Sequence, residues 1–426
     1  MELQDKQVVV LGAGSSGKSA ARLCRHKGAR VRLVEQSLSC VAPWEQSTLQ
    51  QLGISLELGK HYPDQLAGAD LIVLSPGIPW KTVRKQFSDC RAEVCSELEL
   101  AYRYVQEPVI AVTGTSGKTT TVQVIAHILR QVGQEVFLGG NVGVPLSEYV
   151  LGQVQAQVLV LEVSSFQLMH TWSLRPQVGV LLNFAANHLD YHQSLEEYLG
   201  AKLRLFQNQG QRDLAILPLE MKEKLQFRAE IGGRQVYFQA ADDLKCPSLP
   251  GPHNFRNLQA AYLACGHFGV QKWQMQKALQ DFEPDAHRLQ ILGEKAGVLF
   301  VDDSKATTLH ALQAALQSFS RPVLLLAGGR FKGGDPAQLC DLFQDRVKAA
   351  ALFGEDRELF RQAWQDCTRI FTEPDLEQAG RRLLELARPG DVVLLSPATS
   401  SFDQFNDYKA RGQAFQRLVQ EFVCKN

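Results

Sequence analysis

The sequence lacks long apolar runs and an excess of either charge. No uninterrupted hydrophobic stretch among the 426 residues approaches the roughly 18 that a membrane-spanning helix needs, and no secretion signal precedes the first strand pattern. Lys and Arg total 45, as do Asp and Glu, and no basic run stands out. This balance argues against a nucleic-acid or anionic-membrane surface. We therefore expect a soluble cytoplasmic protein whose partners are small molecules.

Paired cysteines, internal repeats and low-complexity segments are also missing from the sequence. The nine cysteines are scattered, odd in number and without the paired spacing of a metal site. Because disulfides are rare inside cells, we expect reduced thiols that mostly pack in the core.

Short apolar segments alternate with helical patterns along nearly the whole chain, which predicts an α/β fold with parallel sheets. A chain of this length exceeds the about 100–200 residues of one domain, so we expect three. We predict domains at residues 1–92, 93–284 and 285–426, because the first unit closes after the turn Ser75–Pro79 and a helical pattern ends at Pro284. The predicted strands are Val8–Leu11, Arg30–Val34, Leu71–Leu74, Val109–Val112, Val158–Leu161, Val178–Leu182, Val298–Val301, Val323–Ala327, Ala349–Phe353 and Val392–Leu395.

The segment Gly114–Thr119 is a shortened phosphate loop between a strand pattern and a helical one. Its two glycines let backbone N–H groups at the start of the helix point at an anion. Lys118 can reach the outer phosphates, and the Thr119 hydroxyl can bind Mg²⁺. The alternative is a strand–turn–helix corner with an exposed lysine, but the order of strand, glycines, Lys-Thr and helix favours a nucleotide.

A second glycine motif, Gly12–Gly17, follows the first strand and precedes a helix. This is the position of a dinucleotide fingerprint, and Glu35 at the end of the next strand is placed to bind a ribose hydroxyl. Alone it suggests an NAD enzyme, although the same geometry binds any pyrophosphate. A glycine-rich turn without a ligand is the remaining alternative.

Polar residues at two further strand ends indicate a metal site. Glu162 ends an apolar strand, where a buried carboxylate costs several kcal/mol unless it is paired or binds a cation. His188 and Asp190 follow the strand next to the phosphate-loop strand, and strand ends converge above that loop. A cation ligand is the simplest explanation of Glu162.

Several segments match one known family in order and spacing. They are Gly114–Thr119, Glu162–Leu168, Asn187–Asp190 and Ala201–Lys202 in the middle of the chain, and Gly251–Ala264, Ala286–Gln290, Asp302–Thr308, Ala327–Asp335 and Leu394–Gly412 towards its end. The first group resembles the central ATPase domain of the Mur ligases. The second resembles the members of that family that add D-glutamate, and its last segment is more specific than either glycine loop.

The resemblance implies a fold and a reaction. The fold is α/β with three domains: an N-terminal Rossmann-like UDP-binding domain, a central P-loop ATPase-like domain with a parallel sheet, and a C-terminal Rossmann-like domain that binds the amino acid. The reaction is the ATP-dependent addition of D-glutamate to UDP-N-acetylmuramoyl-L-alanine through an acyl phosphate, in peptidoglycan precursor synthesis. ATP and Mg²⁺ are then the cofactors, NAD is not involved, and we expect a monomer.

The resemblance also assigns residues to each ligand. The UDP-sugar contacts are Ser15, Ser16, Gly17, Glu35, Gln36, Ser75 and Gly77, with Asn141 near the alanyl end. The ATP contacts are Gly114, Thr115, Ser116, Gly117, Lys118, Thr119, Asn254, Asn257, Arg288 and Asp303. The D-glutamate contacts are Thr307, Lys332, Ser401 and Tyr408. The metal set is Thr119, Glu162 and His188, with Lys202 if it is carbamylated, and the catalytic set is Lys118, His188, Lys202 and Lys305.

Two positions depart from the family pattern. Asn187 stands where an Asp usually precedes the histidine, and Tyr191 stands where a basic residue is common. The loss of a charge can weaken the support of a metal-binding histidine, here His188.

Three other functions remain open from the sequence. Other ATP-dependent amide ligases, such as folylpolyglutamate synthase, share the central motifs and differ in the first and third domains. An NAD(P)-dependent oxidoreductase that uses Gly12–Gly17 leaves Gly114–Thr119 unexplained. A regulatory module that only senses nucleotide would not release phosphate.

Overall fold

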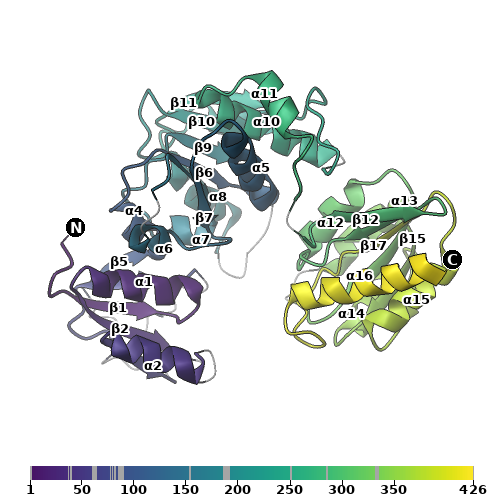
Figure 1. Cartoon of the computed structure of the whole chain (residues 1–426), viewed down its shortest axis with the longest axis horizontal. Coiled ribbons are helices and arrows are strands. Elements are labelled where there is room, and N and C mark those ends of the chain that lie inside the picture. Colours follow the sequence, from purple (N-terminus) through teal and green to yellow (C-terminus); the bar gives the residue numbers. More distant parts are fainter. Residues whose placement is uncertain are drawn as a thin grey trace. The chain divides into compact units, whose positions relative to one another are not determined.

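The computed structural model describes residues 2–36, 38, 41–59, 65–76, 78, 80, 83–84, 91–152, 155–185, 192–249, 252–284, 286–331 and 335–425. Contacts divide the chain into two compact units, residues 1–239 with 257–278 and residues 240–256 with 279–426. Two sheets lie in the first unit and one in the second (Figure 1). Within the described ranges, no helix combines the length and the apolar character needed to cross a bilayer.

The first sheet is parallel, with strand order β3-β2-β1-β4-β5. Its central strands are apolar and almost fully buried, as expected of parallel strands that are covered on both faces. The strand order reverses between β1 and β4, and ligands bind at such a point in open α/β sheets. The elements are β1 (Gln7–Leu11), α1 (Ser15–His26), β2 (Arg30–Glu35), α2 (Pro43–Gln51), β3 (Ile54–Leu58), β4 (Leu71–Leu74) and β5 (Glu93–Ser96).

The second sheet is also parallel, with strand order β11-β10-β9-β6-β8-β7. Strand β6 lies between β8 and β9, so the carboxyl ends of these three strands meet where the phosphate loop begins. The strands are β6 (Val109–Thr113), β7 (Val136–Gly140), β8 (Val158–Glu162), β9 (Val178–Leu181), β10 (Leu214–Pro218) and β11 (Arg234–Phe238). Helices in this part of the chain include α5 (Lys118–Gln131), α6 (Leu146–Leu151), α8 (Leu195–Leu203) and α10 (Pro252–His267).

The third sheet has strand order β12-β13-β17-β14-β15-β16, and only its edge strand β12 is antiparallel among the described strands. Helices α14, α15 and α16 accompany it (Figure 1). The strands are β12 (Gln290–Lys295), β13 (Val298–Asp302), β14 (Val323–Gly328), β15 (Val347–Phe353), β16 (Arg369–Thr372) and β17 (Val392–Leu395). The helices are α12 (Leu309–Gln317), α13 (Cys340–Arg346), α14 (Arg357–Trp364), α15 (Leu376–Leu386) and α16 (Tyr408–Lys425).

Several short elements complete the described chain. They are α4 (Glu97–Tyr102), α7 (Ser165–Leu168), α9 (Lys222–Leu225), α11 (Lys272–Ala278) and the 3₁₀ turns Arg204–Phe206, Leu219–Met221 and Pro336–Leu339. All ten strands predicted from apolar segments are strands of the structure, which confirms the α/β fold. Strand β5, just after the predicted boundary at residue 92, completes the first sheet.

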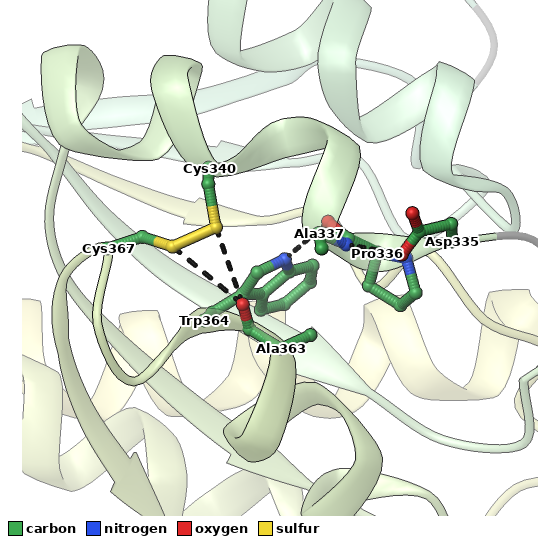
Figure 2. Close-up of a disulfide and its surroundings, with 7 residues drawn as sticks. All are labelled: Asp335, Pro336, Ala337, Cys340, Ala363, Trp364 and Cys367. Carbon is green, nitrogen blue, oxygen red and sulfur yellow. Dashed lines mark hydrogen bonds between the residues drawn. A yellow bond between two sulfur atoms is a disulfide. The ribbon is translucent and has the colours of Figure 1, made fainter.

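The expectation that all cysteines are reduced is wrong for one pair. Cys340 and Cys367 form a disulfide bond, 27 residues apart in sequence and with Cα atoms 5.3 Å apart (Figure 2). Their sulfur atoms lie 3.4 and 3.7 Å from the carbonyl oxygen of Ala363. The Trp364 indole N–H donates to the carbonyl of Pro336 at 2.8 Å, so the start of α13 and the end of α14 pack around one buried ring. This tertiary contact brings the two thiols together, and the spacing of the cysteines in the sequence does not predict it.

Four other cysteines in the described part of the chain are buried free thiols, as expected: Cys24, Cys95, Cys246 and Cys265.

Candidate active site

The phosphate-loop segment lies between β6 and α5, as predicted. Gly117 takes the left-handed conformation that favours glycine, with φ 79°, and it caps the start of α5. The side-chain oxygen of Asn183 accepts hydrogen bonds from the backbone N–H groups of Thr115 and Ser116, both at 3.0 Å. This fixes the loop with its following N–H groups at the helix start, where an anion binds favourably.

Sequence reasoning missed Asn183. It lies two residues after the end of β9, and β9 pairs with the phosphate-loop strand β6. A polar residue at the carboxyl end of that neighbouring strand is the pattern that would have found it.

The predicted nucleotide residue Asn257 packs against the loop. A Cβ atom added to Gly117 would lie 2.4 Å from the side-chain oxygen of Asn257, so any larger residue would displace one of them. Asn257 is 3% exposed and Asn254 is 2% exposed, and both lie on α10. The glycine therefore serves both the turn and the close approach of a predicted base-binding residue.

Two predicted catalytic lysines meet at the carbonyl oxygen of Gly114. Lys118 donates to it at 3.0 Å and Lys202 at 2.8 Å. Lys202 is 1% exposed, and its burial, with the nearby Lys118 charge, holds the Lys202 pKa well below its usual range. The site therefore favours the loss of charge at Lys202.

Tyr198 is a second residue that the sequence did not reveal. Lys202 lies over its ring, with the ammonium nitrogen 4.4 Å from the ring centre. The Tyr198 hydroxyl lies 3.4 Å from the Thr115 hydroxyl. Tyr198 precedes Lys202 by one helical turn of α8, so it links the lysine to the phosphate loop.

Oxygen atoms suited to a hard cation gather beside the loop. The Thr119 hydroxyl donates to one carboxylate oxygen of Glu162 at 2.6 Å, and the Asn141 amide donates to the other at 2.9 Å. Glu162 is 2% exposed, which is costly for a carboxylate without a cation or donors. A hydroxyl and a buried carboxylate are ligands that Mg²⁺ prefers, so these residues fit that ion.

His188, the third predicted metal ligand, lies outside the described residues, as do the departures Asn187 and Tyr191. Among the residues that the structure does describe, no group of three His, Cys, Asp or Glu side chains forms a metal cluster.

The first glycine motif forms the turn between β1 and α1. A Cβ atom added to Gly17 would lie 1.8 Å from the Gly12 carbonyl oxygen, so this close packing requires glycine. The Ala13 N–H donates to the Glu35 carboxylate at 2.9 Å, and the Ser75 hydroxyl donates to the Gly12 carbonyl at 3.0 Å. The predicted Glu35 and Ser75 are thus brought to the same turn.

The remaining UDP-site predictions fall around this turn. Ser15 and Ser16 open α1, and Gln36 is exposed just after β2. Gly77 lies outside the described residues.

In the second unit, Asp303 is buried at the end of β13. It accepts hydrogen bonds from the Ser396 hydroxyl at 2.9 Å and from the Leu289 N–H at 3.1 Å. Burial raises the pKa of its carboxyl to about 7, against the lowering effects of Ser396 and of the Arg288 charge. Asp303 and Arg288, two predicted ATP contacts, therefore act on each other electrostatically.

Of the predicted D-glutamate residues, Tyr408 lies beside the predicted catalytic Lys305. The Lys305 ammonium lies 5.7 Å from the centre of the Tyr408 ring, and Tyr408 opens α16. Ser401 is 2% exposed and Thr307 is half-buried. Lys332 lies outside the described residues.

Arg411 organises this region and was not assigned from the sequence. It is fully buried on α16 and donates to the carbonyls of Ser304, Thr399 and Ser400 at 2.9, 3.0 and 3.2 Å. Burial lowers its pKa to about 10. A guanidinium with five donors can hold several loop carbonyls at once, and here it ties the loop before Lys305 to the loop before Ser401.

Family models match the chain in three parts. The Mur ligase MurD-like N-terminal domain matches residues 6–91, the Mur ligase middle domain matches 112–245, and the Mur ligase glutamate ligase domain matches 287–399.

Curated relatives match almost the whole chain. A protein of Oleidesulfovibrio alaskensis named UDP-N-acetylmuramoylalanine--D-glutamate ligase is 50% identical over 416 residues, which covers 96% of this chain and 93% of that protein. A protein of the same name from Lawsonia intracellularis is 44% identical over 418 residues, covering 98% and 94%.

Solved structures share the fold. A MurF ligase from Thermotoga maritima in complex with ADP has a TM-score of 0.61 at 17% identity, covering 99% of this chain and 96% of that one. A UDP-N-acetylmuramate-alanine ligase of the same organism has a TM-score of 0.59 at 16% identity, covering 99% and 100%.

Proposed function

The chain belongs to the Mur ligase family, and from this premise we propose that it joins D-glutamate to UDP-N-acetylmuramoyl-L-alanine, using ATP, in peptidoglycan precursor synthesis. It is an ATP-dependent ligase that forms an amide bond. The observation that carries the proposal is the arrangement at the shortened phosphate loop, where Lys118, Lys202 and the Thr119–Glu162 pair meet.

The first domain holds the UDP part of the substrate in this proposal. The N–H groups at the start of α1 face its diphosphate, and Gly17 lets α1 pack closely against the Gly12 carbonyl. Ser15, Ser16, Glu35, Gln36, Ser75 and Gly77 are its proposed contacts. Because the relatives at 50% and 44% identity are named for a UDP-sugar, we propose that this turn binds UDP and not NAD.

The middle domain holds ATP. Residues 114–119 surround its phosphates and Lys118 offsets their charge, while Asn254 and Asn257 face the base region. Thr119, Glu162 and His188 would hold Mg²⁺, and Mg²⁺ when bound stabilises charge on the phosphoryl oxygens. Asn141 donates to Glu162 and is proposed to lie near the alanyl end of the sugar substrate.

Lys202 supports the metal site as a carbamate in this proposal. A lysine amine must be neutral to react with carbon dioxide, and the lowered pKa of Lys202 keeps the neutral amine populated. The carbamate would then be an anion close to the Lys118 cation.

The third domain supplies the amino acid and part of the nucleotide contact. Arg288, Asp303 and Lys305 are proposed to reach ATP. A dianionic amino acid needs a cation and hydroxyl donors, which Lys332, Thr307, Ser401 and Tyr408 provide.

The reaction has two chemical steps. The alanyl carboxylate attacks the γ-phosphate of ATP, which gives an acyl phosphate and ADP. The amine of D-glutamate then attacks the acyl carbon, loses a proton, and the tetrahedral intermediate collapses to the amide with release of phosphate. Since an acyl phosphate hydrolyses readily, closure of the third domain over the site is proposed to exclude water.

The organisation of the chain follows from the same proposal. We place the domains at residues 1–92, 93–284 and 285–426. We propose that the chain acts as a monomer and, because it uses ATP, that it acts in the cytoplasm.

A phosphate-release assay tests the function. The protein is given ATP, Mg²⁺ and UDP-N-acetylmuramoyl-L-alanine with D-glutamate, L-glutamate, L-alanine or a diamino acid. We expect release with D-glutamate at least about tenfold faster than with the other three. An amino acid that lacks the second carboxylate, or holds it in another orientation, leaves polar groups of the site unpaired. Release that favours another amino acid would point to a different amide ligase, and nicotinamide reduction without phosphate release would point to an oxidoreductase.

A further inference from the structure

Helix α1 connects the UDP turn to the middle domain. Ser15 at its first position belongs to the proposed diphosphate site, and Ser19 and Arg22 follow at spacings that put all three on one face. Helices α1, α4 and α6 pack against one another within the first unit. The face of α1 that begins at the UDP turn therefore continues into a junction with the second sheet's helices.

Helix α6 connects the same junction to the reaction site. It begins just after the loop that starts at Asn141, whose backbone N–H donates to the Glu162 carbonyl at 2.8 Å. The Asn141 side chain donates to the Glu162 carboxylate, and Gly140 N–H donates to the carbonyl of Val144 at 3.0 Å. The segment between Asn141 and α6 is therefore short, and hydrogen bonds hold it to Glu162, the proposed metal ligand.

One carboxylate joins the two helices. The same oxygen of Glu148, on α6, accepts hydrogen bonds from the Ser19 hydroxyl and from the Arg22 guanidinium of α1. Ser19 is 3% exposed, so its contact with Glu148 is shielded from water, whereas the ion pair of Glu148 with Arg22 is partly solvated, at 26% and 43% side-chain exposure.

A buried contact behind Glu148 fixes the start of α6. Glu97, the first residue of α4, accepts a hydrogen bond from the Ser147 N–H at 2.6 Å. Glu97 is 1% exposed and Ser147 is fully buried. The contact with α4 therefore fixes the orientation of α6. Among the contacts described, Glu148 is the only residue of α6 whose side chain hydrogen-bonds to the UDP-binding helix α1.

We propose that Glu148 is a positioning residue that fixes the distance between the diphosphate turn at Ser15–Gly17 and the reaction site at Asn141–Glu162. This inference rests on the proposed function. A substrate that spans both domains must fit both ends at once, and a misplacement of about 1 Å can cost on the order of a hundredfold in rate. A ligand that touches one domain only does not depend on that distance.

The test compares ligands that span the junction with ligands that do not. Calorimetry gives the Kd of UDP-N-acetylmuramoyl-L-alanine, of UDP alone and of a non-hydrolysable ATP analogue, for the full chain and for Glu148→Ala. We expect the spanning substrate to bind about tenfold more weakly, with kcat/KM reduced to match, and UDP and the ATP analogue to change by less than about twofold. Ser19→Ala should give the same selective loss to a smaller degree, and Ser19→Thr, which keeps the hydroxyl, should restore binding.

The control is Glu373→Ala. Glu373 accepts from Arg382 at 3.3 Å and its side chain is 18% exposed, but this pair lies inside the third domain. We expect all three Kd values to stay unchanged in it. Equal weakening of all three ligands in Glu148→Ala, or of none, overturns the positioning role. If Glu148→Ala does not fold, Ser19→Ala decides by the same criterion. If the unaltered protein releases no phosphate in response to D-glutamate, the proposed function is overturned instead.

Discussion

The ammonium groups of Lys118 and Lys202 donate to one carbonyl oxygen, that of Gly114, at 3.0 and 2.8 Å. Lys118 also donates to the Thr115 carbonyl at 3.1 Å, but neutral acceptors offset little of the repulsion between two neighbouring cations. The lowered pKa of Lys202 follows from burial first and from this repulsion second. The pair is therefore stable when phosphate approaches Lys118 or when Lys202 gives up its positive charge, and the first two predictions test these conditions.

Replacement of Lys118 should stop chemistry without loss of the UDP-sugar site. Lys118→Ala removes the cation that offsets charge on the transferred phosphoryl group, so we expect kcat to fall by on the order of 10²–10³. The Kd of UDP-N-acetylmuramoyl-L-alanine should not change, because its proposed contacts for UDP lie in the first domain. Phosphate release and calorimetry measure the two quantities. Lys6→Ala, at an exposed position near the first strand, is the control, and normal turnover in Lys118→Ala would remove the loop from the mechanism.

Replacement of Lys202 should be rescued by small carboxylic acids. Lys202→Ala removes a buried side chain beside Tyr198, so activity should be lost and a cavity left. Acetate or propionate can enter such a cavity and supply the missing anion, and we expect a partial return of phosphate release. Mass spectrometry of the unaltered protein in bicarbonate should show an added carbamate. No rescue together with no added mass would contradict the carbamate.

Asn183 should matter for ATP more than for the sugar substrate. Asn183→Ala leaves the Ser116 N–H without its side-chain acceptor, while the Thr115 N–H keeps only the backbone carbonyl of residue 183 at 3.3 Å, and a buried unsatisfied donor costs about 1–3 kcal/mol. We expect KM for ATP to rise at least about tenfold, since 1.4 kcal/mol corresponds to that factor. Asn208→Ala, which removes an amide that donates to the Trp172 carbonyl in the same domain, is the matched control. An unchanged KM for ATP would show that the loop keeps its conformation without the Asn183 side chain.

The sequence revealed most of the central strands because burial on both faces demands continuous apolar residues, although it missed β10, which is buried throughout. The strands it missed are mostly edge strands or strands with weak patterns. β3 and β11 are only partly buried, and β12 is exposed at alternate residues and antiparallel. β7 ends in two glycines. For such strands the pairing partner, which lies far away in sequence, decides the conformation.

The residues of the candidate site also fall into those that the sequence predicts and those that it does not. Residues inside contiguous motifs, such as Lys118 and Glu162, were found because their chemistry depends on their neighbours in sequence. Asn183, Tyr198 and Arg411 were missed because their roles depend on contacts across the fold. Asn183 binds residues 67 and 68 positions away in sequence, and Arg411 binds Ser304, which is 107 positions away. The disulfide between Cys340 and Cys367 was missed for the same reason.

Stability should fall as pH rises through the titration of Glu97. Burial raises the pKa of this carboxyl from 4.5 to about 7 in the folded protein, and the neighbouring Glu148 charge adds to the rise. A raised pKa means that the folded state binds the proton more tightly, so the stabilisation is complete below pH 4.5 and is lost as pH rises to about 7. The size is on the order of 3 kcal/mol.

Glu97→Gln should therefore flatten the pH dependence. We expect its thermal unfolding midpoint to vary less than that of the unaltered protein between pH 5 and 8, in scans at unit steps. Asp303, whose pKa is also raised to about 7, should keep some dependence in both proteins. Glu373→Gln serves as the control, and parallel curves for the unaltered protein and Glu97→Gln would contradict the assignment.

The disulfide should stabilise the second unit. The bond between Cys340 and Cys367 closes a loop across 27 residues, and a cross-link of this length restricts the unfolded chain by about 3 kcal/mol. We expect dithiothreitol to lower the urea midpoint of that unit, and Cys340→Ser with Cys367→Ser to lower it equally in the absence of reductant. The double variant should then be insensitive to dithiothreitol, which separates this bond from the buried thiols Cys24, Cys95, Cys246 and Cys265. Because Trp364 packs between Cys367 and the turn that begins at Pro336, hydrogen exchange should rise first in α13 and the end of α14 on reduction. A reductant-independent midpoint in the unaltered protein, with two extra thiols counted by alkylation, would mean that packing alone holds these elements together.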